Sequence, residues 1–200
     1  TGAGAAPSGP AGPADHRRSR SQTGQCSSPT HYGPFLVDAN PPSNPNTFLS
    51  STHTPNVWST NPTVNVSWYG ASDGLGSGVY GYSYHFSPVP TYTPGTTIVG
   101  TDNSVTYTLG DGVWYFHIRT RDLMGNWNSS AVHYGPFRID TNPPTNPTSC
   151  IATPPLGQWS QSVKVDWSGA ADAGIGVWGY SIEWTISPGT VPDAFMDTVV

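Results

Sequence analysis

The chain has 200 residues, among them 23 Gly and 21 Pro, and a formal net charge of −5 at pH 7. Its single Lys (Lys164) and single Glu (Glu183) argue against a helix-rich protein, whereas its many Trp, Tyr, Val and Thr favour strands. The negative charge argues against nucleic acid as a partner, and no apolar run approaches the roughly 18 residues of a membrane span. One short basic cluster is interpreted as solvated surface: Arg17, Arg18 and Arg20. We therefore expect an all-β chain that does not insert into a membrane.

The first two segments differ in composition from the rest of the chain. Residues 1–15, "TGAGAAPSGPAGPAD", are small and rich in Gly and Pro, which predicts a flexible or unassigned segment. In residues 16–39, the stretch "HRRSRSQTGQC" is a degenerate copy of "HIRTRDLMGNW", which begins at His117. Residues 16–39 are therefore predicted to be the last strands of a preceding, degenerate repeat.

One stretch occurs twice. "HYGPFLVDANPPSNPN" begins at His31, "HYGPFRIDTNPPTNPT" begins 102 residues later at His133, and 11 of the 16 positions are identical. The match continues from "VNVSWYGASDGLGSGVYGYSY", which begins at Val64, to "VKVDWSGAADAGIGVWGYSI", which begins at Val163. A period of about 100 residues lets each unit bury its own core. We expect a complete repeat at 40–141 and the N-terminal part of the next at 142–200.

Asn40-Pro41-Pro42 and Asn142-Pro143-Pro144 lie at the boundaries between repeats. Proline fixes φ, removes a donor and biases the preceding residue towards extended geometry. Such a segment could act as a semi-rigid spacer, or it could simply end strand pairing at a sheet edge. The sequence is compatible with both interpretations.

Alternating apolar residues predict the strands of the complete repeat. In "TVNVSW", Val64, Val66 and Trp68 share the inward face. With a first strand near Phe48 and a short strand near 97–99, the repeat has about seven strands, which fits a two-sheet sandwich. The other residues expected on inward faces are Tyr80, Tyr82, Tyr84, Phe86, Val105, Tyr107, Leu109, Trp114, Phe116, Ile118, Phe137 and Ile139.

The last copy stops after its third or fourth strand. It has no counterparts of the strands that hold Val105, Trp114 and Phe137, so half a sandwich would leave an apolar face and an unpaired edge. We expect residues 142–200 to be unstable alone, or to be completed by further chain. The residues expected inward here are Val163, Val165, Trp167, Trp178, Tyr180, Ile182 and Trp184.

The strings "GASDGLGSGVYGYSY", "DGVWYFHIRTRDLMGNW" and "HYGPFRIDTNPP" resemble the fibronectin type III-like and immunoglobulin-like repeats of large bacterial surface and secreted proteins. The resemblance covers residues 40–200, and weakly 16–39. Trp114 stands where such domains carry the aromatic residue that opens their sixth strand. The resemblance implies tandem seven-stranded Greek-key sandwiches, an extracellular setting and no catalytic residues. The turn after this strand contains Asp122, Gly125 and Asn126. In the degenerate first copy, Ser21 stands at the position equivalent to Asp122.

No catalytic, cofactor-binding or metal-binding residue is predicted. Gly76-Ser77-Gly78 lies in a tight loop and does not form a strand-to-helix elbow, which excludes the usual hydrolase pattern. His117 is expected outward on a solvated face, where His133 approaches it if the last two strands pair, but two histidines do not make a metal site. Cys26 and Cys150 occupy non-equivalent positions and are expected to be isolated thiols.

Recurrent aspartates and exposed aromatic residues leave two binding alternatives. Asp38 and Asp140 recur at the repeat boundaries, and Asp73 and Asp172 recur after the second strand. Turn capping explains them, and calcium at the domain junctions is the alternative. Aromatic rings could stack on sugars, and the candidates are Tyr69, Tyr115 and one of the Trp/Tyr strand faces.

These patterns favour a non-catalytic structural or adhesive spacer of a large extracellular, secreted or cell-surface protein. Its partners are then the neighbouring repeats of the same chain. Two alternatives remain. One is a module that binds carbohydrate or a cell-surface protein, and the other is an accessory domain of a secreted enzyme whose catalytic domain lies outside this chain.

Overall fold

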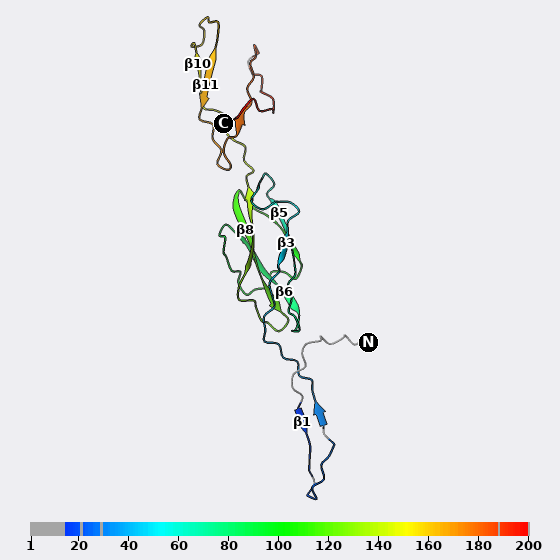
Figure 1. Cartoon of the computed structure of the whole chain (residues 1–200). Coiled ribbons are helices and arrows are strands. Elements are labelled where there is room, and N and C mark those ends of the chain that lie inside the picture. The colour runs from blue at the N-terminus through cyan, green and yellow to red at the C-terminus, as the bar shows by residue number, and fades with distance from the viewer. Residues whose placement is uncertain (1–14, 21, 29, 188, 200) are drawn as a thin grey trace. The chain divides into compact units, whose positions relative to one another are not determined.

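A computed structural model of the chain describes residues 15–20, 22–28, 30–187 and 189–199 (Figure 1). Ser21 lies outside these residues, and so does the segment expected to be flexible, except for Asp15. The described residues form strands, turns and loops without a helix, so the all-β prediction is confirmed. No membrane-spanning apolar helix occurs in this part of the chain.

The described residues divide into two compact units. One contains the residues up to Val57 with Thr63–Thr108 and Val113–Phe137. The other contains Trp58–Pro62, Leu109–Gly112 and the residues from Arg138 onward. Each unit is described by itself below.

The first unit begins with a short hairpin. Strands β1 (Asp15–Arg17) and β2 (Thr30–Tyr32) pair antiparallel, with His16 opposite His31. Phe35 and Val37, which follow β2, are exposed, although their counterparts Phe137 and Ile139 are fully buried. This hairpin therefore buries none of the apolar side chains that follow β2.

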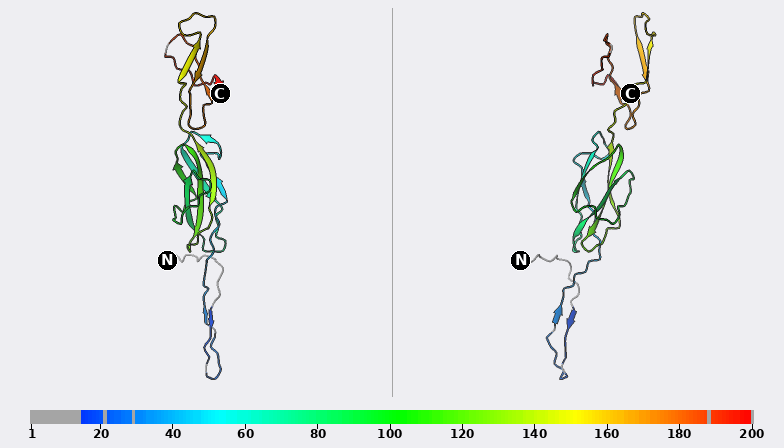
Figure 2. Two further views of the ribbon diagram at one scale, coloured as in Figure 1. Left: turned by 90° about the vertical axis from the view of Figure 1, so that its left-hand side faces the viewer. Right: turned by 180° about the vertical axis from the view of Figure 1, so that it is seen from behind.

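Two sheets, here called the middle sheet pair, contain most of the ordered strands (Figure 2). The three-stranded sheet has the order β3 (Thr47–Leu49), β5 (Thr63–Tyr69) and β7 (Ser104–Thr108). The four-stranded sheet has the order β4 (Trp58–Ser59), β9 (Val132–Ile139), β8 (Gly112–Asp122) and β6 (Val79–Ser87). Strands β4 and β9 pair in parallel.

The alternating residues of β5 lie in the core between the sheets. Val64, Val66 and Trp68 are fully buried, as predicted. The Trp68 ring stacks on Phe116 of β8 at 5.4 Å and meets Tyr82 of β6 edge-on at 5.4 Å. Because these rings come from both sheets, the arrangement is consistent with a β-sandwich. The other buried apolar residues are Phe86, Leu109, Ile118, Phe137 and Ile139.

Three details of the predicted strands are wrong, and the first is that Tyr107, expected to face inward, is 56% exposed. Tyr80 does not lie in the core: it is 44% exposed and its ring contacts the Arg121 guanidinium. The cause is a register shift between Val79 and Gly81, which turns Tyr80 away from the face of Tyr82. The short strand expected near 97–99 is only an isolated bridge between Tyr82 and Gly100.

The second unit contains four short strands besides β4. Strand β10 (Ser149–Thr153) pairs with β11 (Lys164–Ser168), and β12 (Gly179–Tyr180) pairs with β13 (Thr198–Val199). Trp167 on β11 lies opposite Cys150 on β10, as Trp68 on β5 lies opposite Phe48 on β3. Trp178, Trp184 and Val163, which were expected inward, are exposed.

Candidate functional site

The repeated proline stretches connect one set of strands to the next. We call residues 38–46 the first junction and residues 140–148 the second junction. The first junction leads from the β2 hairpin to β3. Pro42 and Pro45 are fully buried, while Pro41 is exposed. The two buried prolines, three residues apart, are thus packed within the first unit.

Side chains fix the first junction to strand β8 and the loop after it. The Thr120 N–H donates to Asn44 Oδ1 at 2.9 Å, and Asn44 Nδ2 donates to the Ser130 carbonyl at 2.8 Å. Asn128 Nδ2 donates to the Pro42 carbonyl at 2.8 Å. Asn44 therefore satisfies a backbone donor at a fully buried strand position, which explains why an Asn stands between the two buried prolines.

Both junctions make the same bond to a loop, the first to the loop after β5 and the second to the loop after β11. At the first, Ser43 N–H donates to the Ser72 carbonyl at 2.7 Å. At the second, Thr145 N–H donates to the Ala171 carbonyl at 2.8 Å. Asn142 and Thr141 are also bound by the Asp111 carboxylate. The repeated sequence thus encodes a repeated set of contacts.

The first residue of each junction is an aspartate whose carboxylate accepts a hydrogen bond from a backbone N–H group. Asp38 Oδ2 accepts from the Ser77 N–H at 2.7 Å, and Asp140 Oδ2 accepts from the Ile175 N–H at 3.1 Å. Ser77 and Ile175 are counterparts in the repeat alignment. The Ser77 hydroxyl and N–H together lower the pKa of the Asp38 carboxyl below its usual value, so this group is ionised at neutral pH.

Three carboxylates meet beside the first junction. One oxygen each of Asp38, Asp73 and Asp122 lies within 4.8 Å of the others, and Asp122 is fully buried. A Cβ at Gly76 would lie 2.5 Å from Asp73 Oδ2, so only glycine fits here without displacing a carboxylate. Oxygen ligands of this kind suit calcium.

The same carboxylates also cap turns, as the sequence analysis expected. Asp122 Oδ1 accepts from the N–H groups of Gly125 and Asn126 at 2.6 and 2.8 Å. Asp73 Oδ2 accepts from the Gly78 N–H at 2.7 Å. These bonds account for the cluster without an ion, and calcium at the junction stays a prediction. Asp122 was expected only as a turn residue, because nothing in its local sequence places it beside Asp38.

A second cluster of polar side chains lies on the outer face of the four-stranded sheet. His117 Nδ1 lies 2.7 Å from His133 Nδ1, so the predicted approach of His133 is confirmed. The expected solvated environment of His117 is wrong, since the side chain is 0% exposed. The Tyr92 ring, from the loop after β6, packs on the rings of His117 and His85 at 5.7 and 5.1 Å. This loop, not the sheet, buries the histidine.

The pair formed by Ser87 and His117 resembles a nucleophile and its base, but its hydrogen bonds are arranged differently. Ser87 Oγ donates to the Val89 carbonyl at 3.1 Å and lies 3.0 Å from His117 Nε2. The direction of the Ser87–His117 hydrogen bond depends on the His117 tautomer. Both Ser87 and His117 are buried, so neither side chain is open to a substrate.

Burial, followed by the neighbouring His133 and His85, lowers the pKa of His117 from its usual value to about 4. His117 therefore stays neutral at physiological pH.

The remaining candidates lie apart from these clusters. Cys26 and Cys150 are free, exposed thiols, as expected. Gly76-Ser77-Gly78 lies in the turn between β5 and β6, so no nucleophile elbow forms there. Tyr69 is 51% exposed at the end of β5. Tyr115 is half-buried on β8, with its ring 6.5 Å from that of His117.

Comparisons with protein families, curated proteins and solved structures found no match to this chain.

Proposed function

We propose that this chain is a non-catalytic structural or adhesive spacer from a large secreted or cell-surface protein. In this proposal its repeats are tandem seven-stranded Greek-key sandwiches of the fibronectin type III-like or immunoglobulin-like kind. A spacer requires units that fold on their own and connections that limit the angles between them. The sequence period, the two facing sheets and the buried prolines all support this role.

The observation that carries the proposal is the recurrence of the junction contacts. Asp38 and Asp140 accept equivalent N–H groups, and Ser43 and Thr145 bind equivalent carbonyls. A linker that only joined two units would need no such bonds, because flexible linkers leave their backbone to water. Bonds that recur from one repeat to the next favour a connection whose geometry matters.

The polar clusters also support a non-catalytic role. Among the described residues, the serine and histidine that come closest to a catalytic pair, Ser87 and His117, are both buried, and Ser87 Oγ also donates to the Val89 carbonyl. The clustered aspartates are capped by backbone N–H groups.

Small-angle X-ray scattering of the chain tests the proposed stiff connection. We expect Pro41→Gly combined with Pro42→Ser to broaden the distribution of interatomic distances, because the junction loses its fixed φ angles and its buried ring. The matched control is Pro88→Gly combined with Pro90→Ser, two exposed prolines in the loop after β6, which should leave the distribution unchanged. A parent chain that already scatters as a freely jointed one would refute the spacer.

The alternative is a module that binds carbohydrate or a surface protein through exposed aromatic rings. The exposure of Tyr69 is the observation that favours it. Glycan-array binding that disappears in Tyr69→Ala or Tyr115→Ala would support this function. A role as an accessory domain of a secreted enzyme would instead require a catalytic domain elsewhere in the polypeptide.

A further inference from the structure

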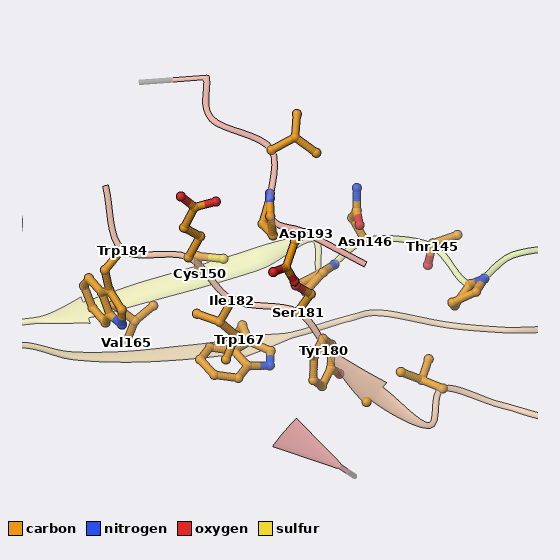
Figure 3. A pocket seen from close by; sticks show the side chains of 17 residues that line it. Thr145, Asn146, Cys150, Val165, Trp167, Tyr180, Ser181, Ile182, Trp184 and Asp193 are labelled. Carbon is orange, nitrogen blue, oxygen red and sulfur yellow. The ribbon is translucent and has the colours of Figure 1, made fainter. Parts of the chain in front are cut away.

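The second unit contains an apolar groove of about 580 Å³. Figure 3 shows aromatic and aliphatic side chains from β11, β12 and the residues after β12 gathered along it. The Trp184 side chain is 71% exposed, which is unusual for the largest apolar residue. The lining residues used below are Val165, Trp167, Tyr180, Ile182 and Trp184.

The counterparts of these residues form the core of the middle sheet pair. Trp167 meets Tyr180 edge-on, with ring centroids 5.6 Å apart and an interplanar angle of 70°. Trp68 meets Tyr82 in the same way, at 5.4 Å and 81°. Because the local geometry is the same, the groove is the inner face of a sheet and not a cavity shaped for a small ligand.

The middle sheet pair shows what covers such a face. Phe86, the counterpart of Trp184, is only 8% exposed. Its ring contacts Tyr107 at 5.7 Å, Phe116 at 5.0 Å and Phe137 at 6.3 Å. These three rings come from β7, β8 and β9. The described residues of the second unit contain no counterpart of any of these three strands.

The backbone of β11 also indicates that strands would cover this face. Strand β5 pairs with β3 on one edge and with β7 on the other. In the described part of the chain, its counterpart β11 pairs with β10 alone. The second edge of β11 therefore presents N–H and C=O groups that a strand satisfies and a sugar or a lipid does not.

We propose that this groove accepts three strands with the alternation of Ser104–Ile139, carried on the same polypeptide. The first would pair with β11 as β7 pairs with β5. Aromatic residues equivalent to Phe116 and Phe137 would then cover Trp167 and Trp184. The entry point is set by β13, because Thr198 lies opposite Tyr180 much as Gly100 lies opposite Tyr82.

The test is an extended chain in which a copy of residues 103–141 follows Val200, because Thr198 corresponds to Gly100. The matched control carries the same extension with its copies of Phe116 and Phe137 replaced by Ser. Hydrogen exchange measured by mass spectrometry reports on the amides of β11 and β12. In the extended chain we expect these amides to exchange about 100-fold more slowly than in the parent, with no change in the control.

The amides of Val64 and Val66 serve as an internal standard that each variant is folded. Equal exchange of β11 in the two extended chains, with the standard protected, would overturn the proposal. So would a parent chain that already protects β11 by self-association in sedimentation experiments, because the occupant would then be a second copy.

Discussion

Trp68 shows how one residue can decide whether a sheet pair folds. It lies on β5, is fully buried and contacts rings from β6 and β8. Its counterpart Trp167 has the same neighbour on β12 but no ring from a β8 equivalent among the described residues. The tryptophan at this position therefore contributes more to the free energy of unfolding in the middle sheet pair than in the second unit.

We expect Trp68→Ala to lower the free energy of unfolding of the middle sheet pair by about 3–5 kcal/mol, because truncation of a buried Trp leaves a cavity. A domain has only about 5–15 kcal/mol in total, so this loss should populate the unfolded state at moderate temperature. Urea unfolding measures it. The control Trp167→Ala should leave the same transition unchanged, and a small shift with Trp68→Ala would contradict the core assignment.

His117 should make the stability of the chain depend on pH. The folded pKa is about 4, below the unfolded value of about 6.5, so the folded state resists the proton that the unfolded state binds. The stabilising contribution of His117 is therefore complete above pH 6.5 and decreases as the pH falls towards 4. Solvent near the exposed His133 and His85 screens part of the effect, and we expect a loss of about 2 kcal/mol.

Urea unfolding at pH 7 and pH 4.5 tests this dependence. His117→Gln, which can keep one hydrogen bond but cannot titrate, should lose most of the difference between the two pH values. His31→Gln, an exposed histidine on β2, should retain it. Equal pH dependence in the parent and in His117→Gln would show that other groups are responsible.

At the level of elements, the alternation of apolar residues predicted the features that depend only on the sequence of the strand itself. Val64, Val66 and Trp68 share a face because the period of a strand is two residues, so β5 could be predicted without its partners. The orientation of Tyr80 could not, because the register shift at Val79 depends on pairing with β8. The burial of His117 could not either, because it depends on a loop folding back over the sheet.

The candidate site was predicted in the same incomplete way. Repetition identified Asp38 and Asp73, since each recurs in the next copy. Their proximity to Asp122 arises only when three segments far apart in the sequence meet. The role of Asn44 was also missed, although it is written twice, as Asn44 and Asn146, between two prolines.

Asn44 provides a test of the first junction as an element. Asn44→Ala removes the acceptor of the Thr120 N–H and leaves a donor at a buried strand position without its partner. We expect a cost of about 1–3 kcal/mol. Thermal unfolding of the parent, Asn44→Ala and the counterpart Asn146→Ala, whose side chain is exposed, measures the difference. Equal melting temperatures for the two variants would mean that the junction is not held through Asn44.

At the level of the whole molecule, the proposed spacer function requires that a complete repeat buries its own core. The middle sheet pair meets this requirement, because its inner aromatic residues come from its own strands. The second unit displays the same face uncovered. Independent folding of a complete repeat would support the proposed spacer function.

Calorimetric unfolding of the isolated segment 38–141 tests this claim most directly. The account predicts one cooperative transition, with equal calorimetric and van't Hoff enthalpies, at the temperature where the middle sheet pair unfolds in the whole chain. A gradual loss of structure without a heat-absorption peak would show that these residues need their neighbours to fold, and would contradict the account.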